Sequence, residues 1–345
     1  MSFYIFLIII LLFLLAHYKV GGINKPKSLE YFAFFILALV LAIRFDIGAD
    51  YSQYYQVFET TLARNEILKY EPLNGLLFFL LSPLNSPELI IATYAGITIS
   101  ILFFAIRENT TNLFLGVFTY VGLFYLSAFS TMRQGLAIVI ILYSYKYLKS
   151  QRYRLFYFYV IIAGLFHYSA FIGIFFPLLY KIKPIHMFFA MLICALLFEL
   201  GTNVLEKIPY VNKYASYLQM TNNFGGGNFQ KIFMWCIIAF LWFFKSKTYN
   251  SNTKALVLAS FGCIFPMILG SHLGGRLAQY FYIFLCIAAP NILSHNKLIV
   301  KEIYISILAI WFLGYVQIAT DGNSKAFIPY QTIFEINSSN FNFKQ

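Results

Sequence analysis

Long runs of apolar residues, separated by short polar stretches, fill most of this sequence. The runs are continuous, so they predict helices and not the alternating strands of about ten residues that form a membrane barrel. Helices also satisfy every backbone polar group inside a bilayer. The pattern predicts an all-α protein with about 12 transmembrane helices, at 2–17, 30–44, 88–106, 111–129, 134–148, 155–168, 169–180, 185–201, 231–244, 255–270, 276–293 and 303–318.

Two stretches need a separate interpretation. The apolar run 72–84 is short and has prolines on both sides, so we predict a re-entrant or interfacial segment and not a crossing. The run 155–180 would invert the topology of everything after it if it formed one helix. We predict two short arms that meet near His167, although no strong turn residue marks the bend.

Composition indicates that the bilayer is the solvent for this chain. Sixty per cent of the 345 residues are hydrophobic and 11 % are charged, whereas soluble chains carry roughly a quarter charged residues. The net charge of +12 would suit a nucleic-acid partner, but inner loops of membrane proteins also accumulate Lys and Arg. We therefore predict no nucleic-acid binding.

Loop charges favour one topology. With the N-terminus outside and 72–84 not crossing, most Lys and Arg residues fall in short inner loops, and the outer loops are near neutral. The prediction is one transmembrane domain over 1–345. Its external parts are the loops 45–71 and 202–230 and the C-terminal tail 319–345.

Charged side chains at membrane depth are costly, so each one is a candidate functional residue. In the predicted topology, polar residues from five separate segments fall at the same outer boundary. They are Arg44, Asp46, Asp50, Tyr51 and Tyr54 after the second span, Glu71 before the re-entrant segment, Arg133 and Gln134 at the fifth span, His167 at the bend, and Arg276 at the eleventh span.

Each candidate also has a structural interpretation. Arg44 and Asp46 could form an interfacial ion pair, and Asp50 alone suits a solvated loop. A carboxylate such as Glu71 is favoured at a helix start. Arg133 could reach lipid headgroups, and His167 could hydrogen-bond within the bundle. The convergence of all these residues at one boundary favours the functional interpretation.

The chemistry that such a set supports is transfer from a lipid diphosphate. Arginine makes bidentate contacts with phosphate oxygens, so Arg133 and Arg276 could hold the diphosphate as it leaves. A carboxylate or an imidazole could take the proton of an acceptor hydroxyl. The histidines are scattered and no Asp-x-Asp pair flanks a span, so the sequence predicts no metal and no other cofactor.

Several short motifs resemble the EpsG-like family of polysaccharide polymerases, which are relatives of the Wzy O-antigen polymerases. Residues 30–180 carry most of the resemblance, in the family's order, with Ala49 at a position where the family more often has Thr. The motifs are Arg44-Phe45-Asp46-Ile47-Gly48-Ala49-Asp50-Tyr51 with Tyr54, Tyr70-Glu71-Pro72-Leu73, Arg133-Gln134-Gly135-Leu136-Ala137, Tyr143-Ser144-Tyr145-Lys146-Tyr147-Leu148, and Phe166-His167-Tyr168-Ser169-Ala170.

The resemblance implies a bacterial inner-membrane, metal-independent glycosyltransferase whose active face is periplasmic or external, with a GT-C-like architecture as one option. Such an enzyme moves a growing glycan from undecaprenyl diphosphate to the non-reducing end of a lipid-linked repeat unit. Its partners would be those lipid-linked oligosaccharides, membrane lipid and a chain-length regulator. The implied roles place Arg133 and Arg276 on the diphosphate, His167 or Asp50 as the base, and Arg44 with Asp46 as orienting residues.

Three other functions remain open. A flippase for the lipid-linked repeat would show repeated halves with polar breaks at mid-membrane, and we find no repeat. A membrane O-acyltransferase would need a His with an acidic partner, and His167 has none nearby in sequence. A ligase that ends glycan growth is chemically so similar that the sequence separates it poorly from a polymerase.

Overall fold

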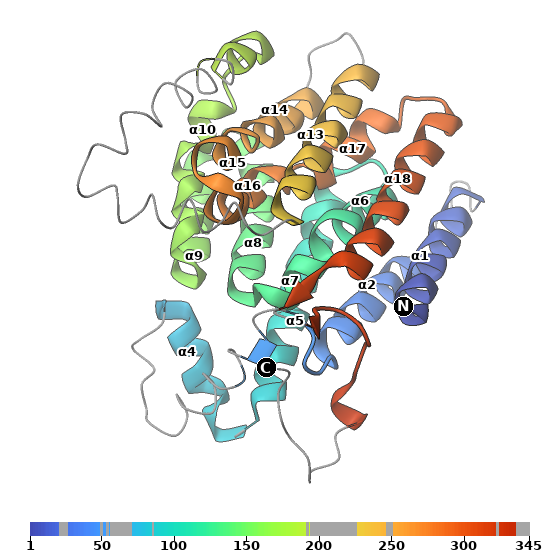
Figure 1. Cartoon of the computed structure of the whole chain (residues 1–345). Coiled ribbons are helices and arrows are strands. Elements are labelled where there is room, and N and C mark those ends of the chain that lie inside the picture. The colour runs from blue at the N-terminus through green and yellow to red at the C-terminus, as the bar shows by residue number, and fades with distance from the viewer. Residues whose placement is uncertain are drawn as a thin grey trace. The chain divides into compact units, whose positions relative to one another are not determined.

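The computed structural model of the chain describes residues 1–20, 27–48, 51–52, 55, 71–84, 86–190, 193, 226–245, 251–321 and 324–335. Figure 1 shows the helices in order along the chain, and the structure divides into two compact units. Unit 1 comprises Met1–Phe171 and Leu298–Gln345, and unit 2 comprises Ile172–Lys297. The predicted single transmembrane domain stays a prediction.

The described residues of unit 1 are mostly helical, with a short hairpin and an isolated β-bridge that both involve its C-terminal part. Within unit 1, α2 packs on α5, α5 on α8 and α8 on α9, while α18 packs on α6 and the π-helical segment η3. The elements are α1 (Ser2–Val20), α2 (Lys27–Ala42), α4 (Pro72–Leu81), η2 (Ser82–Leu84), α5 (Pro87–Asn109), α6 (Leu113–Tyr120), η3 (Val121–Tyr125), α7 (Leu126–Ser130), α8 (Met132–Lys149), α9 (Tyr153–Phe166), η4 (Tyr168–Phe175, which ends in unit 2), α18 (Leu298–Ile318), β1 (Thr320–Asp321), β2 (Ser324–Lys325) and η7 (Ile333–Glu335).

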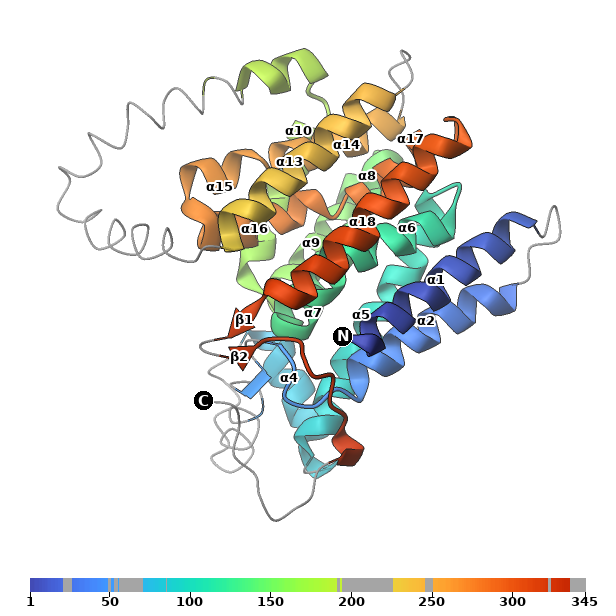
Figure 2. The same cartoon turned by 45° about the vertical axis from the view of Figure 1, so that its right-hand side comes forward.

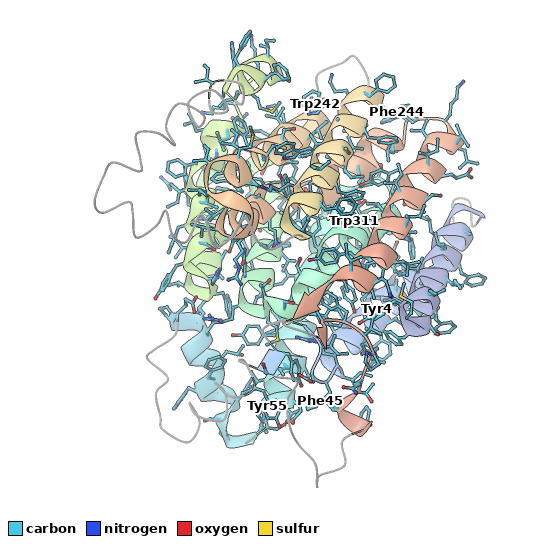
Figure 3. All side chains as sticks on the ribbon, in the orientation of Figure 1. Tyr4, Phe45, Tyr55, Trp242, Phe244 and Trp311 are labelled. Atoms are coloured by element: carbon cyan, nitrogen blue, oxygen red, sulfur yellow. The ribbon has the colours of Figure 1, made fainter. Side chains whose placement is uncertain are left out.

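Unit 2 is a second helical bundle. Its helices α13 and α14 both pack against α17, and Trp242 and Phe244, labelled in Figure 3, lie near the end of α13. Asn296 donates a hydrogen bond to the main-chain oxygen of Phe244, with 3.1 Å between donor and acceptor. The elements are α10 (Phe176–Leu179), α13 (Gly226–Phe244), α14 (Ser251–Phe261), α15 (Ile264–Ile268), η6 (Gly270–Gly274), α16 (Gly275–Tyr282) and α17 (Leu285–Leu293).

The helical fold class is confirmed, and the predicted number of crossings is confirmed only in part. Among the described residues, three helices are long and apolar enough to cross a membrane: α5, the continuous stretch Leu113–Ser130, and α18. The pair α16 and α17, bent by 41°, could form a fourth span. Shorter apolar helices occupy other predicted runs. The remaining crossings, including the run 185–201 that lies largely outside the described residues, stay predictions.

The exposed faces of α1 and α2 are apolar, which suits contact with lipid. These two helices lie side by side (Figure 2). Phe6, Phe13 and Phe35 each have more than half of their surface exposed. A soluble monomer rarely exposes a continuous patch of such side chains. This surface is therefore consistent with a membrane protein.

The predicted break near His167 is confirmed. Helix α9 ends at Phe166, His167 has extended backbone angles (φ −159°, ψ 114°), and a 3-10 helix follows. Gly164, in the last turn of α9, faces the chain that follows this break. A Cβ atom there would lie 2.5 Å from the ring of Phe171, so a larger residue at this position would require that ring to move.

The C-terminal strap, residues 326–333, holds the turn at residues 44–48 after α2. An isolated antiparallel bridge pairs Arg44 with Thr332. Further main-chain hydrogen bonds run from Phe45 N–H to Gln331 O (2.9 Å), from Gly48 N–H to Ala326 O (3.0 Å) and from Ile333 N–H to Ile43 O (3.0 Å). The chain end therefore fixes the motif that follows the second predicted span.

The strap also reaches α1. The ring of Tyr330 stacks on Phe3 with 3.8 Å between ring centroids, and the Tyr330 hydroxyl donates to Val40 O at 2.7 Å. The buried Tyr4, labelled in Figure 3, donates its hydroxyl proton to Phe327 O at 2.8 Å. These contacts tie the start of the chain, the end of α2 and the strap together.

Substituting Gly48 with alanine is expected to destabilise unit 1 strongly. Gly48 has φ +102°, and a Cβ atom there would lie 2.5 Å from Phe129 O. The backbone conformation alone costs about 1–3 kcal/mol for a residue other than glycine, and the contact with Phe129 adds to it. Thermal unfolding of the detergent-purified protein measures the effect.

Gly96→Ala is the matched control for Gly48→Ala. Gly96 lies within α5, and a Cβ atom there would have no atom within 4 Å. Alanine in a helix is favoured over glycine by about 0.8–1 kcal/mol, so this variant should unfold at or above the wild-type temperature. Equal melting temperatures for the two variants would contradict the proposed packing of Gly48.

Candidate functional site

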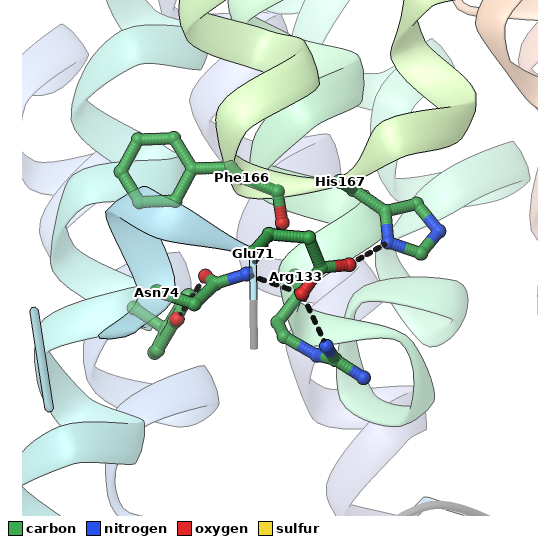
Figure 4. A network of polar contacts seen from close by, with 6 residues as sticks. Glu71, Asn74, Arg133, Phe166 and His167 are labelled. Carbon is green, nitrogen blue, oxygen red and sulfur yellow. Dashed lines mark hydrogen bonds and ion pairs between the residues drawn. The ribbon is translucent and has the colours of Figure 1, made fainter. Parts of the chain in front are cut away.

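The carboxylate of Glu71 is the centre of a polar cluster in unit 1 (Figure 4). Oε1 of Glu71 lies 3.0 Å from Nδ1 of His167. Oε2 accepts a hydrogen bond from Nη1 of Arg133 at 2.6 Å and another from Nδ2 of Asn74 at 3.0 Å. The two oxygens of one side chain therefore connect a histidine and an arginine from different helices.

Local sequence explains why Glu71 stands at this point. It is the residue before α4, with φ −54° and ψ 142°, and Pro72 opens the helix. Proline is favoured at the first helical position, and a carboxylate is favoured at a helix N-terminus. The side chain makes no hydrogen bond that caps the helix, so its oxygens can bind Arg133 and His167.

Arg133 is placed by the break between α7 and α8. Helix α7 ends at Ser130, Thr131 leaves the helical conformation, and Arg133 is the second residue of α8. A cation at a helix N-terminus is electrostatically unfavourable, so the carboxylate of Glu71 compensates it. About a quarter of the Arg133 side chain (26 %) remains exposed, compared with 8 % of the Glu71 side chain. Figure 4 shows one terminal nitrogen of Arg133 turned toward Glu71 and the other turned away.

His167 is placed by the end of α9. Its main-chain N–H donates to Ala163 O at 2.9 Å and so closes the last turn of the helix. An ionised carboxylate can only accept hydrogen bonds, so beside Glu71 the Nδ1 atom of His167 carries a proton. In the neutral ring this leaves Nε2 with a lone pair. The side chain is 25 % exposed.

Two residues that the sequence analysis did not select complete the cluster. The Asn74 side chain is fully buried and also donates to Phe166 O at 2.6 Å. The hydroxyl of the buried Tyr94, on α5, donates to Oδ1 of Asn74. Asn74 was detectable, because it is a polar residue within an apolar run and three positions after Glu71. Tyr94 is one of 27 tyrosines and carried no comparable signal.

The surroundings hold Glu71 in its ionised form. Burial alone raises its pKa, but the hydrogen bond from His167, a main-chain hydrogen bond, the charge of Arg133 and the hydrogen bond from Asn74 outweigh burial and lower the pKa from 4.5 to about 2. Glu71 precedes α4 and lies outside the helices long enough to cross a membrane. It is therefore a fixed negative charge at neutral pH.

Acid is expected to remove the stability that Glu71 contributes. Because its pKa is lower in the folded state, this contribution is complete above the unfolded value of 4.5 and is lost as pH falls toward about 2. Melting temperatures of wild type and Glu71→Gln, measured in detergent from about pH 7 to about pH 3, test this. We expect the difference in melting temperature between wild type and Glu71→Gln to stay constant above pH 4.5 and to become smaller below it. A difference that does not change with pH would contradict the ionised cluster.

The structure places the other predicted residues elsewhere. Arg44 is fully buried, with hydrogen bonds to Leu41 O and, at 3.2 Å, to Phe129 O. Its guanidinium carbon lies 5.7 Å from the ring centroid of Tyr51, which is also fully buried. Asp46 is half-buried in the same turn, with φ 47°. These residues form a packed turn around the buried guanidinium of Arg44.

The remaining predicted residues divide into three groups. Gln134 follows Arg133 in α8 and is buried. Arg276 is the second residue of α16, half-exposed, and belongs to unit 2. Asp50 and Tyr54 lie outside the described residues. Their neighbour Tyr55 is described and packs edge to face with Phe45 at 6.3 Å between centroids (Figure 3).

Metal chemistry has no candidate centre in the part of the chain that the structure describes. No group of three or more His, Cys, Asp or Glu side chains is arranged there to hold a metal ion. The charged groups that could bind an anionic substrate in the described cluster are arginine and histidine.

Fold and site together define a helical membrane protein with a histidine, a carboxylate and an arginine joined in one cluster. Comparison with known families gives a match to the EpsG family over residues 27–332, most of the 345-residue chain. The chain belongs to the EpsG family, as the sequence motifs predict, and this membership indicates a polysaccharide polymerase-type role. No curated protein and no solved structure gives a significant match.

Proposed function

We propose that this protein is a glycan polymerase of cell-surface polysaccharide biosynthesis. It transfers the growing chain from undecaprenyl diphosphate to the non-reducing end of an incoming lipid-linked repeat unit. The observation that carries the proposal is the Glu71 carboxylate, which holds His167 at 3.0 Å and Arg133 at 2.6 Å. A base and a phosphate-binding cation are the two groups that this transfer needs.

On the acceptor side, His167 is the proposed base. The acceptor hydroxyl oxygen attacks the anomeric carbon of the donor, and its proton passes to Nε2 of His167. The ionised Glu71 holds the proton on Nδ1 and stabilises the imidazolium that forms. The same division of roles operates in catalytic triads, where the carboxylate orients the histidine and does not itself take the proton.

On the donor side, Arg133 is the proposed diphosphate ligand. As the anomeric carbon–oxygen bond breaks, its electron pair stays with undecaprenyl diphosphate, and negative charge grows on the phosphate oxygens. An arginine fork stabilises that charge. Arg276, selected from the sequence, stays a candidate for a second diphosphate ligand. Arg44 is not carried into this role, because its guanidinium is buried against main-chain oxygens.

The reaction is proposed to need no metal, because arginine supplies the positive charge that a metal would supply. The proposed setting is the bacterial inner membrane, crossed many times, with the cluster on the periplasmic or external face. That side follows from the distribution of Lys and Arg over the predicted loops. A chain-length regulator is a proposed partner.

The structure also strengthens one rival function. An O-acyltransferase was disfavoured because His167 has no acidic neighbour in sequence, but Glu71 is such a neighbour in space. A His–carboxylate pair alone would suit acyl transfer to a sugar hydroxyl. Arg133 on the other oxygen of the same carboxylate favours a diphosphate donor, as does membership of the EpsG family.

Glycan length on a gel separates these functions. Cells that lack the gene are compared with the same cells carrying the wild-type gene, and lipid-linked repeats are located by labelling from each side of the membrane. We expect the ladder to collapse to single repeats in the null, with the lipid-linked repeats exposed on the outer side, and to return with the wild-type gene.

Other outcomes would overturn the proposal in recognisable ways. Repeats trapped on the inner side would identify a flippase. A ladder of normal length with altered acylation would identify an acyltransferase. Polymers of normal length that remain on undecaprenyl diphosphate, and are not passed to a final acceptor, would identify a ligase.

A further inference from the structure

Asn74 connects the cluster to three helices. It is the third residue of α4, and its side chain has no exposed surface. Nδ2 donates to Oε2 of Glu71 and to Phe166 O, the last carbonyl of α9, while Oδ1 accepts from Tyr94 on α5. Within unit 1, a single amide thus binds the carboxylate and the residue before His167.

The amide groups of Asn74 match these partners in only one orientation. The two N–H groups face two acceptors, and the single oxygen faces a hydroxyl donor. With Asn74 donating to Oε2, this oxygen carries the bonds from Arg133 and Asn74, and Oε1 is directed to His167. The last carbonyls of a helix lack partners within the helix, and the bond to Phe166 O anchors the end of α9.

We propose that Asn74 is the positioning residue of this site: it fixes the rotation of the Glu71 carboxylate and the end of α9, so that His167 donates from Nδ1 and presents Nε2 to the acceptor hydroxyl. This inference rests on the proposed glycosyl transfer. Asn74 itself touches no reacting atom. Its hydrogen bonds act on the reaction through Glu71 and His167.

A purely structural role makes a different prediction. If Asn74 only joined α4, α5 and α9, its loss would lower the amount of folded protein, and the folded remainder would keep its turnover rate and pH profile. If it positions the carboxylate, its loss lowers kcat in protein that is folded. A misplacement of about 1 Å in a catalytic group costs about 10²-fold in rate.

The test measures polymerisation by purified protein on lipid-linked repeat units extracted from cells that lack the gene. Asn74→Ala is expected to lower kcat by about 10²-fold and to change KM by less than about threefold. Asn109→Ala is the matched control: Asn109 is a buried asparagine at the end of α5 whose side chain donates to Ala105 O at 2.8 Å. It should keep the wild-type kcat.

The pH–rate profile of Asn74→Asp is a second measurement, and a purely structural role of Asn74 would leave it unchanged. In the described cluster, Glu71 contacts His167, Arg133 contacts Glu71, and the hydroxyl of Tyr94 is hydrogen-bonded to residue 74. Nδ2 of Asn74 lies 3.0 Å from Oε2 of Glu71, and two carboxylates that close share one proton. The introduced carboxyl group can therefore replace the amide donor only while that proton is bound, so the pH–rate profile of Asn74→Asp should gain a limb that falls as pH rises.

The outcomes separate this inference from the proposed function. An inactive His167→Ala protein, together with an Asn74→Ala protein of wild-type kcat, would overturn the positioning role alone. An Asn74→Asp profile that coincides with wild type would also overturn it. An active His167→Ala protein would instead remove the proposed base, and the proposed mechanism would fail with it.

Discussion

Replacing His167 with alanine is expected to reduce polymerisation about 10²–10⁴-fold, which is the range that general-base catalysis contributes. The imidazole is bonded to the ionised Glu71 at 3.0 Å and keeps a quarter of its surface exposed. A buried histidine that only packed between helices would not need an accessible ring. Initial rates of the purified variant on extracted lipid-linked repeats measure the effect.

Chemical rescue tells a missing base from a damaged fold. Loss of the ring leaves space beside Glu71, so added imidazole should restore part of the activity of His167→Ala in proportion to its concentration. His295→Ala is the control: His295 is an exposed residue of unit 2 after α17. It should keep wild-type activity, with no response to imidazole. A folded His167→Ala protein with wild-type activity would exclude the residue as the base.

Much of the helical fold could be predicted from apolar runs alone. The predicted run 303–318 lies inside α18, and 231–244 lies inside α13. One predicted run is interrupted at a position that hydropathy does not mark. The run 255–270 divides at Gly262, where a Cβ atom would lie 2.7 Å from the ring of Tyr282. A straight and a broken helix of the same residues have the same hydropathy, so composition could not reveal the break.

The sequence could predict site residues only where an ionisable side chain lies at membrane depth, because burying its charge there is energetically costly. Glu71, Arg133 and His167 are candidates because an ionisable side chain at membrane depth is energetically costly and is usually functional. The structure brings these three residues together. The same argument selected Arg44. Its buried charge is instead stabilised by main-chain oxygens and by the faces of aromatic rings. Sequence shows that a charge needs a partner but does not show whether that partner is a substrate or the backbone.

The packing of the strap could not be predicted from the sequence. Residues 326–333 fell in the predicted external tail, to which no function was assigned, yet they hold the turn at 44–48 through main-chain hydrogen bonds. Main-chain pairing leaves little trace in side-chain identity. The family match ends at residue 332 and so includes nearly all of the strap, which agrees with its place in the fold.

Arg133→Ala is expected to lower kcat about 10²–10³-fold, the range seen when one donor to a developing oxyanion is removed. Arg133→Lys should recover only part of this loss, because lysine keeps the charge but not the planar fork that binds phosphate oxygens bidentately. The measurement is polymerisation on extracted lipid-linked repeats, with binding of undecaprenyl diphosphate measured alongside. Arg154→Ala, an exposed arginine in the first turn of α9, is the matched control and should behave as wild type.

The ion pair with Glu71 raises an alternative that the single variants cannot exclude. If Arg133 serves only to neutralise Glu71, removing it should cause no further loss of activity once Glu71 is replaced by neutral glutamine. No buried charge is then left unpaired. The double variant Glu71→Gln/Arg133→Ala tests this through a double-mutant cycle. Diphosphate binding predicts that the loss caused by Arg133→Ala persists at about 10²-fold in the Glu71→Gln background. Equal activity of the double variant and Glu71→Gln would reduce Arg133 to a structural partner of the carboxylate, and the donor phosphate would then need a different cation, with Arg276 the next to be tested.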